Sequence, residues 1–579
     1  MKLLKKLSWF FKLEKWPYIT GILALSLVSL LNLLPPRVIG EVIDQIASKD
    51  LTNLELAYQL FLLVLSALAM YVLRFVWRKY ILGTANRLGR ILRYRLFEHF
   101  TRMSPSFYQT YRTGDLMAHA TNDINAVVGV AGGGVMSAVD ASITALVTVL
   151  TMFFVLDWRL TLIAILPLPF MAWGTSLIGR KNHESFKAAQ EAFSDLNNKV
   201  QESVSGIKVT KSFGYQDAET AAFARINQDV FKKNILAAKY NALFDPMVLI
   251  FVGLSYLLTL IFSGLFISQG QLTLGELVTF ITYLDMLVWP LQAMGYLFNI
   301  SQRGAVSYER IESLLAKESD VTEVASPIKD IKNGRLDYSI QKFAYDDRPT
   351  LRDIRFSIDQ GQTLGIVGVT GSGKTTLLRL LLREQDIQDG NICLAGHDIR
   401  DYSLSAFRSL IGYVPQDQIL FATSIRDNIR FGNPSLSDED VIAVTKLCGI
   451  YEDIMQMPDG FDTLVGERGV SLSGGQKQRL AMCRALILNP DILILDDSLS
   501  AVDAKTEHLI LDNLKRERSG KTTLITAHRL SAVVHADLIL VLDQGRVIES
   551  GSHQELLTQD GWYATTYQNQ QLAESLEEV

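Results

Sequence analysis

The sequence predicts two domains of different class, an all-α transmembrane domain of six helices followed by an α/β domain built around a P-loop. Three observations predict this. Apolar stretches long enough to span a bilayer recur before residue 303, short strands and helices alternate after residue 335, and the segment GVTGSGKTT occupies residues 368–376. A chain of 579 residues is also too long for a single hydrophobic core.

Composition agrees with a membrane protein and excludes some partners. The hydrophobic fraction of 48% and the mean hydropathy of +0.18 exceed the usual values for soluble enzymes. A net charge of only −5 gives no overall field for nucleic acid, so no nucleic-acid partner is expected. Cys393, Cys448 and Cys483 show neither metal-site nor disulfide spacing, which fits a reducing compartment and small apolar packing groups.

The chain opens with MKLLKKLSWFFKLEK, in which five lysines alternate with Leu, Trp and Phe. A basic start could belong to a signal peptide. The apolar run that follows, Trp16–Pro36, is however too long for a signal core and has no small-residue cleavage site. An interfacial amphipathic helix leading into the first span is the better interpretation.

Six apolar stretches of spanning length are expected to cross the lipid bilayer. The third stretch, Ala141–Leu156, is short by itself and is expected to extend back across Asp140. The stretches are Trp16–Pro36, Leu56–Leu73, Ala141–Leu156, Leu160–Gly179, Pro246–Gly275 and Leu277–Gln302. An even number of spans predicts that both ends of the chain lie on one side of the membrane.

The positive charges orient these spans. Arg74–Asp140 carries nine Lys or Arg and Arg180–Asp245 carries ten, whereas the connections Arg37–Glu55, Asp157–Arg159 and Gln269–Glu276 carry three together. By the positive-inside rule, a multi-pass protein of the cell membrane with cytoplasmic termini is predicted. The two long segments approach the length at which the rule weakens, but the short opposite loops are clear.

Both long cytoplasmic segments are helix-like, so the helices are expected to reach well beyond the bilayer. Turn residues in Ser104–Asp123 and in Gly206–Glu219 predict a reversal in each segment, at which a helix pair could present its tip to a cytoplasmic domain. Ordinary interhelical loops are the alternative.

A few residues inside the spans stand out. Asp285 lies in an otherwise uncharged stretch, where a carboxylate costs about 2.5–3.5 kcal/mol and should face a cavity or a partner group. Substrate contact and a structural hydrogen bond are both open. Gly129 and the triplet Gly132–Gly134 could allow close helix contact or bending.

The P-loop lies between a short apolar strand, Thr363–Val367, and a leucine-rich helical run, Thr376–Glu384. This strand–loop–helix unit directs backbone N–H groups and a positive helix end at one point, which suits the phosphates of a nucleotide. Lys374 is expected to reach the β- and γ-phosphates, and the Thr375 hydroxyl to bind Mg²⁺. The residues expected around the phosphates are Gly368, Thr370, Gly371, Ser372, Gly373, Lys374, Thr375 and Thr376.

Further parts of a phosphate site follow in order. The strand Ile492–Leu495 ends in Asp496, whose carboxylate could meet the Mg²⁺ held by Thr375. LSGGQ at 472–476 opens a helical run, and Ser473 with the free amides there could bind an anion. His528 follows another apolar strand.

With LSGGQ added to the P-loop, all 579 residues resemble the ATP-binding cassette (ABC) family, in the half-transporter layout of its exporters. The resemblance implies domains at 1–316 (transmembrane), 317–334 (linker) and 335–579 (ABC ATPase). It also implies that Ser473, Gly475 and Gln476 complete the ATP site of a second half-transporter.

The resemblance also assigns single residues. It implies that Tyr345 stacks on adenine, that Gln416 links Mg²⁺ to the membrane domain, and that Asp496 holds Mg²⁺. It further implies that Asp503 crosses the dimer interface and that His528 contacts the γ-phosphate. Glu467, and the tips around TGDLMAHATND and FGYQDAE, resemble elements that join the ATPase to the membrane domain.

One residue departs from the family pattern. Asp497 stands where the family has a catalytic Glu, and its side chain is shorter by one methylene. Misplacing a carboxylate by roughly an ångström can cost about 10²-fold in rate, although relaxation or a bridging water could compensate. LSGGQ, which the resemblance assigns to the ATP site of the second half-transporter, is intact. Because two identical chains would have two impaired sites, the sequence predicts a heterodimer in which the chain's own ATP site hydrolyses poorly.

The predicted function is therefore ATP-driven export by alternating access, with ATP and Mg²⁺ as cofactors. The resemblance is closest to bacterial multidrug exporters, and the apolar spans suit hydrophobic or amphipathic substrates. Lipid or peptide export, and a regulatory membrane subunit gated by ATP, remain alternatives. The six spans exclude the soluble ABC ATPases.

Overall fold

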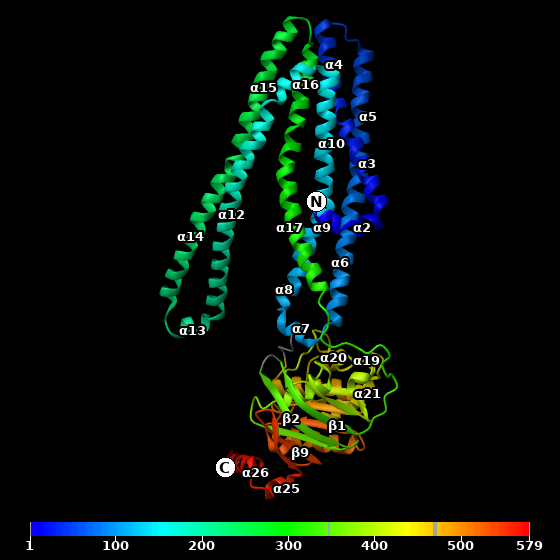
Figure 1. Cartoon of the computed structure of the whole chain (residues 1–579), viewed down its shortest axis with the longest axis vertical. Helices are drawn as coiled ribbons and strands as arrows, with labels where there is room; N and C mark the ends of the chain where they lie inside the picture. The colour runs from blue at the N-terminus through cyan, green and yellow to red at the C-terminus, as the bar shows by residue number, and fades with distance from the viewer. Residues whose placement is uncertain (1, 346–347, 467–471, 578–579) are drawn as a thin grey trace. The chain divides into compact units, whose positions relative to one another are not determined.

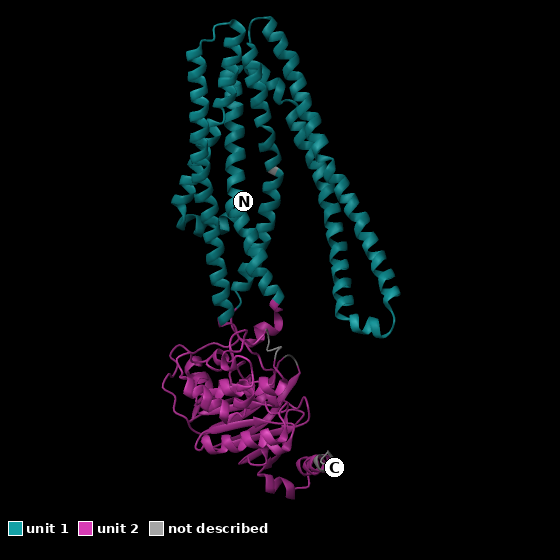
Figure 2. Ribbon diagram, turned by 180° about the vertical axis from the view of Figure 1, so that it is seen from behind, with its two compact units in different colours: residues 1–101, 114–317 teal, residues 102–113, 318–579 magenta. Residues whose placement is uncertain are grey.

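A computed structural model describes the chain except for residues 1, 346–347, 467–471 and 578–579. It divides into two compact units (Figure 2). Unit 1 comprises residues 1–101 and 114–317, and unit 2 comprises residues 102–113 and 318–579. The short segment 102–113 thus belongs with the second unit although it lies within the first half of the sequence.

Among the described residues, unit 1 contains six helical stretches long and apolar enough to cross a membrane, as predicted. They are Lys15–Ser48, Asn53–Arg102, Thr113–Leu156, Trp158–Ser205, Gln216–Ser268 and Leu274–Leu315. Their lengths of 34 to 53 residues correspond to roughly 50–80 Å of helix, against a hydrocarbon core of about 30 Å. The helical stretches are therefore long enough to extend beyond the bilayer, as the prediction requires.

These stretches are built from successive helices, several of them joined through one turn of π-helix. The elements are α1 (Lys2–Lys6), α2 (Ser8–Leu13), α3 (Lys15–Leu31), α4 (Leu34–Ser48), α5 (Asn53–Trp77), η1 (Arg78–Leu82), α6 (Gly83–Arg102), α8 (Thr113–Ala118), η2 (His119–Asp123), α9 (Ile124–Gly129), η3 (Val130–Gly134), α10 (Val135–Thr151), η4 (Met152–Leu156), α11 (Trp158–Ile165), α12 (Pro167–Ser205), α13 (Ile207–Ser212), α14 (Gln216–Ala242), α15 (Phe244–Ser268), α16 (Leu274–Met286) and α17 (Val288–Leu315).

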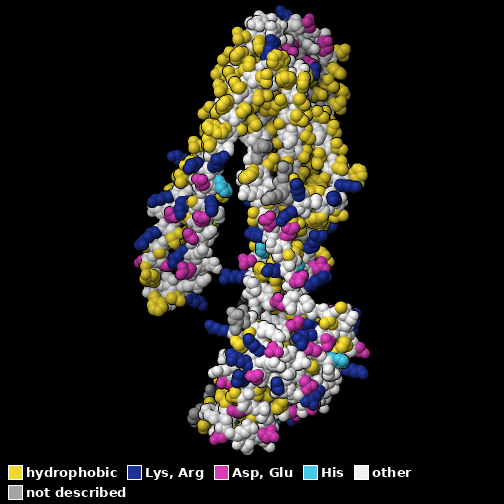
Figure 3. Space-filling model, viewed as in Figure 1, with side chains coloured by type: hydrophobic (Ala, Val, Ile, Leu, Met, Phe, Trp, Pro, Cys, Tyr) yellow, Lys and Arg dark blue, Asp and Glu magenta, His cyan; other side chains and the backbone are white. Residues whose placement is uncertain are grey.

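Helices α12 and α14 run side by side to α13 and diverge there from α6 and α17 (Figure 1). Hydrophobic side chains cover the opposite end of unit 1, while charged side chains gather towards α13 (Figure 3). This division is the one expected of helices that leave a bilayer for water.

The N-terminal segment is amphipathic, as predicted. Leu3, Leu7 and Phe10 are at most 1% exposed, whereas Leu13 and Trp16 are 66% and 68% exposed. The buried face packs within unit 1, and the exposed apolar side chains fit the membrane interface.

The glycines near the third span permit a close helix contact. A Cβ atom on Gly132 would lie 3.0 Å from the Cβ of Ala85, so a larger residue would push these helices apart. Gly132 lies in the π-helical turn η3, which faces the turn η1 of the preceding span. Of the two alternatives for these glycines, close helix contact is therefore present at Gly132.

Each predicted reversal contains a short helix. In Gly206–Glu219 it is α13, none of whose residues is buried. In Ser104–Asp123 it is α7 (Pro105–Thr110), which belongs to unit 2.

Unit 2 has an α/β core of two sheets in its described part. An antiparallel sheet has the order β2-β1-β4-β5, and a mainly parallel sheet has the order β10-β9-β3-β8-β7-β6. The strands are β1 (Leu336–Ala344), β2 (Pro349–Ile358), β3 (Thr363–Gly368), β4 (Asp389–Leu394), β5 (His397–Asp398), β6 (Ile411–Val414), β7 (Ile492–Asp496), β8 (Thr522–Thr526), β9 (Leu538–Asp543) and β10 (Arg546–Gly551).

Helices cover these sheets and enclose two apolar cores. They are α18 (Lys374–Leu381), η5 (Ile399–Asp401), α19 (Leu404–Ser409), α20 (Ile425–Ile429), α21 (Asp438–Leu447), α22 (Tyr451–Met455), η6 (Gly460–Asp462), α23 (Gly474–Leu486), α24 (Ala504–Glu517), η8 (Leu530–Val533), α25 (His553–Thr558) and α26 (Trp562–Glu577). Cys448 and Cys483 are fully buried, and all three cysteines are free thiols.

The segment expected to be a linker, 317–334, packs on unit 2 from residue 318 onward. The Ile328 amide donates to the Asp401 carbonyl, and the Ser403 amide donates to the Ile328 carbonyl, each over 2.9 Å. The chain that leaves α17 is therefore held by the second unit over most of this segment.

The topology can be tested by cysteine labelling in intact cells, in a variant with Cys393 replaced by alanine. We expect Gln269→Cys, between α15 and α16, to react with an impermeant maleimide from outside. Asp217→Cys, beside α13, should react only after permeabilisation. The reverse pattern would contradict the predicted orientation.

Candidate functional site

The site lies at the carboxyl ends of parallel strands in the six-stranded sheet. Strands β6, β7, β8 and β3 lie next to one another, and β9 follows β3, all in parallel pairing. Because parallel strands end at the same edge, the loops after β3, β6, β7 and β8 are brought together. These loops carry the P-loop, Gln416, Asp497 and His528.

The P-loop depends on glycines with positive φ. Gly368 has φ +142°, and a Cβ there would lie 2.0 Å from the Leu542 carbonyl oxygen. Gly373 has φ +105°, and a Cβ would lie 2.7 Å from the Leu351 side chain. Only glycine allows the loop to turn this close to the neighbouring strands before α18 begins.

Lys374, the first residue of α18, points back across the loop. Its Nζ donates to the carbonyl oxygens of Gly368 at 2.9 Å and Val369 at 3.1 Å. Burial lowers the pKa of Lys374, and the negative charges of Asp497 and Asp496 act against that shift. The ammonium group is therefore placed where added phosphate charge would stabilise it.

The remaining P-loop residues surround the same point. Ser372 is 2% exposed and its hydroxyl has no hydrogen-bond partner among the described atoms. Its carbonyl accepts from the Gly545 amide at 3.1 Å, which ties the loop to the β9–β10 turn. Thr370 and Gly371 are exposed at the tip of the loop.

Asp496 is the most strongly held carboxylate of the site and is 1% exposed. Its Oδ1 accepts from the Thr375 hydroxyl at 3.0 Å and from the Thr526 hydroxyl at 2.7 Å. Its Oδ2 accepts from the Tyr413 hydroxyl at 3.4 Å. The oxygens of Thr375 and Asp496 thus form an adjacent pair of the hard donors that Mg²⁺ prefers.

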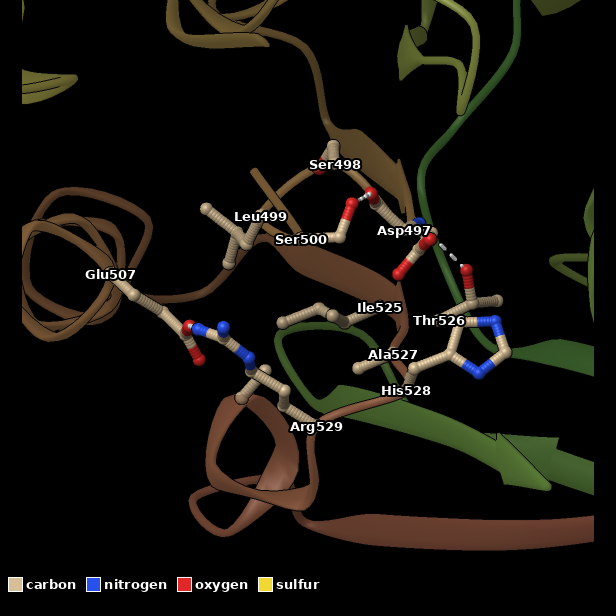
Figure 4. Close-up of a pocket in the computed structure, with 11 residues that line it drawn as sticks. Asp497, Ser498, Leu499, Ser500, Glu507, Ile525, Thr526, Ala527, His528 and Arg529 are labelled. Carbon is tan, nitrogen blue, oxygen red and sulfur yellow. Dashed lines mark hydrogen bonds and ion pairs between the residues drawn. The ribbon is translucent and has the colours of Figure 1, made fainter. Parts of the chain in front are cut away.

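Asp497 follows in a left-handed backbone conformation, φ +48°. Its amide donates to both oxygens of Thr526, at 3.1 Å and 3.0 Å, and its carbonyl accepts from the Ser500 hydroxyl at 3.0 Å (Figure 4). Burial raises the pKa of Asp497 and the Asp496 charge adds to this, while His528 and Lys374 oppose it.

Gln416 and His528 flank Asp497. The Gln416 amide nitrogen lies 3.5 Å from Asp497 Oδ2. His528 lines the same pocket as Asp497, with its ring beside Thr526 (Figure 4). Its backbone carbonyl accepts from Gln570 at 2.9 Å, so α26 holds the residue in place.

Tyr345 lies on the other side of α18. The ring packs edge-on against Phe343 at a centroid distance of 5.2 Å, and its hydroxyl donates to Thr376 Oγ1 at 3.3 Å. The tyrosine is 39% exposed, beside the P-loop helix.

LSGGQ begins α23 with a capping box. The Ser473 hydroxyl accepts from the Gln476 amide at 3.3 Å, and Gln476 Oε1 accepts from the Ser473 amide at 3.0 Å. Gly475 could not be larger, because a Cβ would lie 2.8 Å from the Ala501 carbonyl oxygen. The capping box thus satisfies the first amides of the helix, while Ser473 and Gly474 are exposed.

The roles that the family pattern predicts for Asp503 and Glu467 remain predictions. The Asp503 carboxylate caps α24 by accepting from the Thr506 amide at 2.9 Å, and this hydrogen bond lowers the pKa of Asp503. That local role does not follow from the resemblance. Glu467 lies outside the described residues.

Sequence reasoning missed Thr526 and Tyr413, which both bind Asp496. Thr526 is the register partner of Asp496 across β8 and β7, so its position depends on strand pairing. The only sequence signal is a hydroxyl residue at the end of an apolar strand, two residues before His528.

In the membrane part, Asp285 accepts from the Tyr256 hydroxyl at 3.2 Å. The structural hydrogen bond, one of the two alternatives for Asp285, is therefore present. Asp285 is nevertheless exposed within this chain, so contact with a substrate is still possible in geometric terms.

A six-span helical domain joined to an ATPase domain with these motifs defines the half-transporter class of ABC exporters. The ABC transporter transmembrane region matches residues 18–291, and the ABC transporter domain matches residues 351–500. Together with the relatives below, these matches show that the chain belongs to the ABC transporter family and acts as an ATPase coupled to transport.

The chain is 43% identical to the probable multidrug resistance ABC transporter ATP-binding/permease protein YheI of Bacillus subtilis, over 98% of each chain. It is 40% identical to the multidrug resistance-like ATP-binding protein MdlA of Escherichia coli, over 100% of this chain and 98% of the relative. The structure of a bacterial Atm1-family ABC exporter with ATP bound matches with a TM-score of 0.81 and 28% identity, over 96% of this chain and 99% of that one.

The assignment of the phosphate site can be tested with Lys374→Ala. We expect ATP affinity at this chain's site to fall roughly 10- to 100-fold, because a charge-assisted contact worth about 1.5–3 kcal/mol is lost. Equilibrium binding of a fluorescent ATP analogue measures this. Lys515→Ala, at an exposed position of α24, is the matched control, and unchanged affinity in Lys374→Ala would contradict the assignment.

Asp285 has a test of its own. If it contacts substrate, Asp285→Asn should reduce export of cationic dyes several-fold more than export of neutral ones, because only the cations lose an attraction. Tyr256→Phe, which removes the hydrogen bond but keeps the carboxylate, is the control. Equal effects on both dye classes would assign Asp285 a packing role only.

Proposed function

We propose that this chain is one half of a heterodimeric exporter of amphipathic compounds, and that its own ATP site binds nucleotide but hydrolyses it slowly. The observation that carries the proposal is Asp497, in the position where the family has a catalytic Glu, beside otherwise complete binding elements. Export powered by ATP follows from the family, whereas the heterodimer and the slow site are inferred here.

The backbone around Asp497 argues against compensation for the short side chain. The Asp497 amide donates to the carbonyl and hydroxyl oxygens of Thr526, and the Asp497 carbonyl accepts from the Ser500 hydroxyl. Moving the carboxylate outward by roughly one methylene would break these contacts or change a left-handed conformation. The Asp497 carboxylate would therefore stay short of the position that a glutamate reaches.

Binding of Mg²⁺ and ATP does not depend on that methylene. Thr375 and Asp496 would hold Mg²⁺, with Gln416 close by, and the metal would neutralise charge on the phosphates. The P-loop amides and Lys374 would bind the phosphates, and the partly exposed ring of Tyr345 would stack on the adenine. His528 would approach the γ-phosphate from the end of β8.

Two surfaces that this chain leaves exposed support the presence of a second half. Val209, Phe213 and Tyr215, at or next to α13, are 61–82% exposed. Exposed apolar side chains at a helical tip fit a contact with another polypeptide. The exposed LSGGQ helix start, with its capping box, fits the completion of an ATP site in the second half.

The proposed cycle uses these parts in sequence. ATP bound at this chain's P-loop would draw LSGGQ of the second half towards it, and the closure would change the side on which the spans open. Lipid or peptide export is the alternative for the cargo. An ATP-gated regulatory subunit would instead show no increase in ATP turnover when a drug is added.

The heterodimer can be tested by measuring ATP turnover of the chain alone and with a second half-transporter that carries the catalytic Glu. We expect turnover only in the mixed complex, and Asp497→Asn should leave it within about twofold, because this site contributes little. Asp497→Glu, the matched gain-of-function variant, should raise turnover of the chain alone by up to about 10²-fold. Vigorous turnover by the unmodified chain alone, lost in Asp497→Asn, would contradict the proposal.

A further inference from the structure

Helix α7 belongs to the soluble unit, although it is covalently continuous with two spans. The chain enters α7 from α6, at the end of the second span, and leaves it towards α8, at the start of the third. Residues 102–113 nevertheless group with residues 318–579 (Figure 2). The contacts that hold α7 in unit 2 therefore also connect the second and third spans to the ATPase.

Helix α7 lies against the C-terminal end of the P-loop helix α18. Pro105, Ser106 and Gln109 line one side of a pocket whose other side contains Tyr345, Arg379, Leu380, Glu384 and Gln385. Four of those five residues lie in the last turns of α18 or just beyond it. The fifth, Tyr345, donates to Thr376 in the first turn.

The chain that leaves the last span reaches the same place. The Ser106 hydroxyl donates to the Asp320 carboxylate, which joins α7 to the segment after α17. Two residues further on, the Thr322 carbonyl accepts from Arg383 Nη2 at 2.8 Å. Segments following the second and the sixth span thus meet at one end of α18.

Arg383 is the residue on which this meeting depends. It follows α18 with φ +51° and is 2% exposed, so its charge is desolvated. Its guanidinium binds both carboxylate oxygens of Asp386, at 2.7 Å and 3.1 Å. The guanidinium also donates to two backbone carbonyls, from Nη1 to Arg400 at 3.4 Å and from Nη2 to Thr322 at 2.8 Å, and the Thr322 contact is the shorter one.

The end of α18 is closed by a second arginine. Arg408 donates to the Leu382 carbonyl at 3.1 Å and to the Arg383 carbonyl at 2.9 Å, which satisfies the carbonyls that a helix end leaves free. The helix is eight residues long, about 12 Å, and its other end is the P-loop. A shift at the phosphate end would therefore move this end as a rigid rod.

We propose that Ser106, Asp320, Thr322 and Arg383 form an exit latch, through which one helix, α18, moves the connection between the second and third spans together with the end of the sixth. Arg383 is a positioning residue: it touches no nucleotide and acts by holding Thr322. The inference requires ATP-driven movement of the spans but not the heterodimer.

The test breaks the latch at its exposed bond and leaves the buried arginine intact. Ser106→Ala and Asp320→Ala are each made in the complete exporter, together with a reporter cysteine, Tyr296→Cys, at a half-exposed position of α17. Labelling of the reporter by a permeant maleimide is compared with and without ATP, and ATP affinity is measured in parallel. We expect ATP affinity to stay within about twofold and the ATP-dependent change in labelling to fall about fivefold or more.

Controls separate the latch from general damage. Ser326→Ala and Asp330→Ala make the same chemical changes at exposed positions of the same segment and should leave the labelling change intact. The double variant Ser106→Ala/Asp320→Ala should be no worse than either single one, because both remove the same bond. An unchanged response in the single variants, additive losses in the double one, or no ATP response in the unmodified exporter would each overturn the proposal.

A second arm fixes the latch instead of breaking it. Ser106→Cys and Asp320→Cys are combined in a Cys393→Ala background and joined with a short bifunctional thiol reagent. Because the two segments move together, we expect the cross-linked exporter to keep its ATP-dependent labelling change and its export of ethidium. Loss of the labelling change on cross-linking would overturn the latch, whereas absence of ethidium export already in the unmodified exporter would contradict only the proposed cargo.

Discussion

The hydrogen bonds around Asp496 are the constraint on which the site depends. One buried carboxylate joins Thr375 on α18, Thr526 on β8 and its own strand β7. A buried charge of this kind is stable only when its acceptor positions are filled, so the three elements cannot move apart without large cost. These hydrogen bonds thereby keep the P-loop, the residue after β7 and the loop after β8 close to one another.

A different constraint governs the membrane domain. Within a bilayer every backbone polar group must be satisfied inside its own helix, which is why helical stretches of 34 to 53 residues, several with π-helical turns, carry the chain through. The same long helices carry α13 away from the apolar zone of unit 1 (Figures 1 and 3). The length of the helices, and not a sequence motif, therefore sets how far this part of the membrane domain extends beyond the apolar zone.

What the sequence predicts is what local pattern determines. The six spans follow from apolar length, and the P-loop follows from glycines whose φ no other residue tolerates, as at Gly368. Thr526 and Tyr413 could not be found in this way, because each reaches Asp496 from a neighbouring strand. The contact of Arg383 with Thr322 could not be found either, because 61 residues separate the two in the chain. Placement of α7 with the soluble unit likewise depends on packing that no periodicity encodes.

The site separates two properties that a single catalytic domain usually combines. In the proposed site, affinity would reside in the backbone amides, Lys374 and Thr375 at the start of α18, while hydrolysis would depend on the reach of one side chain after β7. A shorter side chain there would slow hydrolysis and leave nucleotide binding unchanged. Since Arg383 follows the end of α18, a nucleotide that stays bound would still hold the far end of that helix in place. A slow site of this kind would therefore still fix the geometry of its own half while the opposite site determines the rate of turnover.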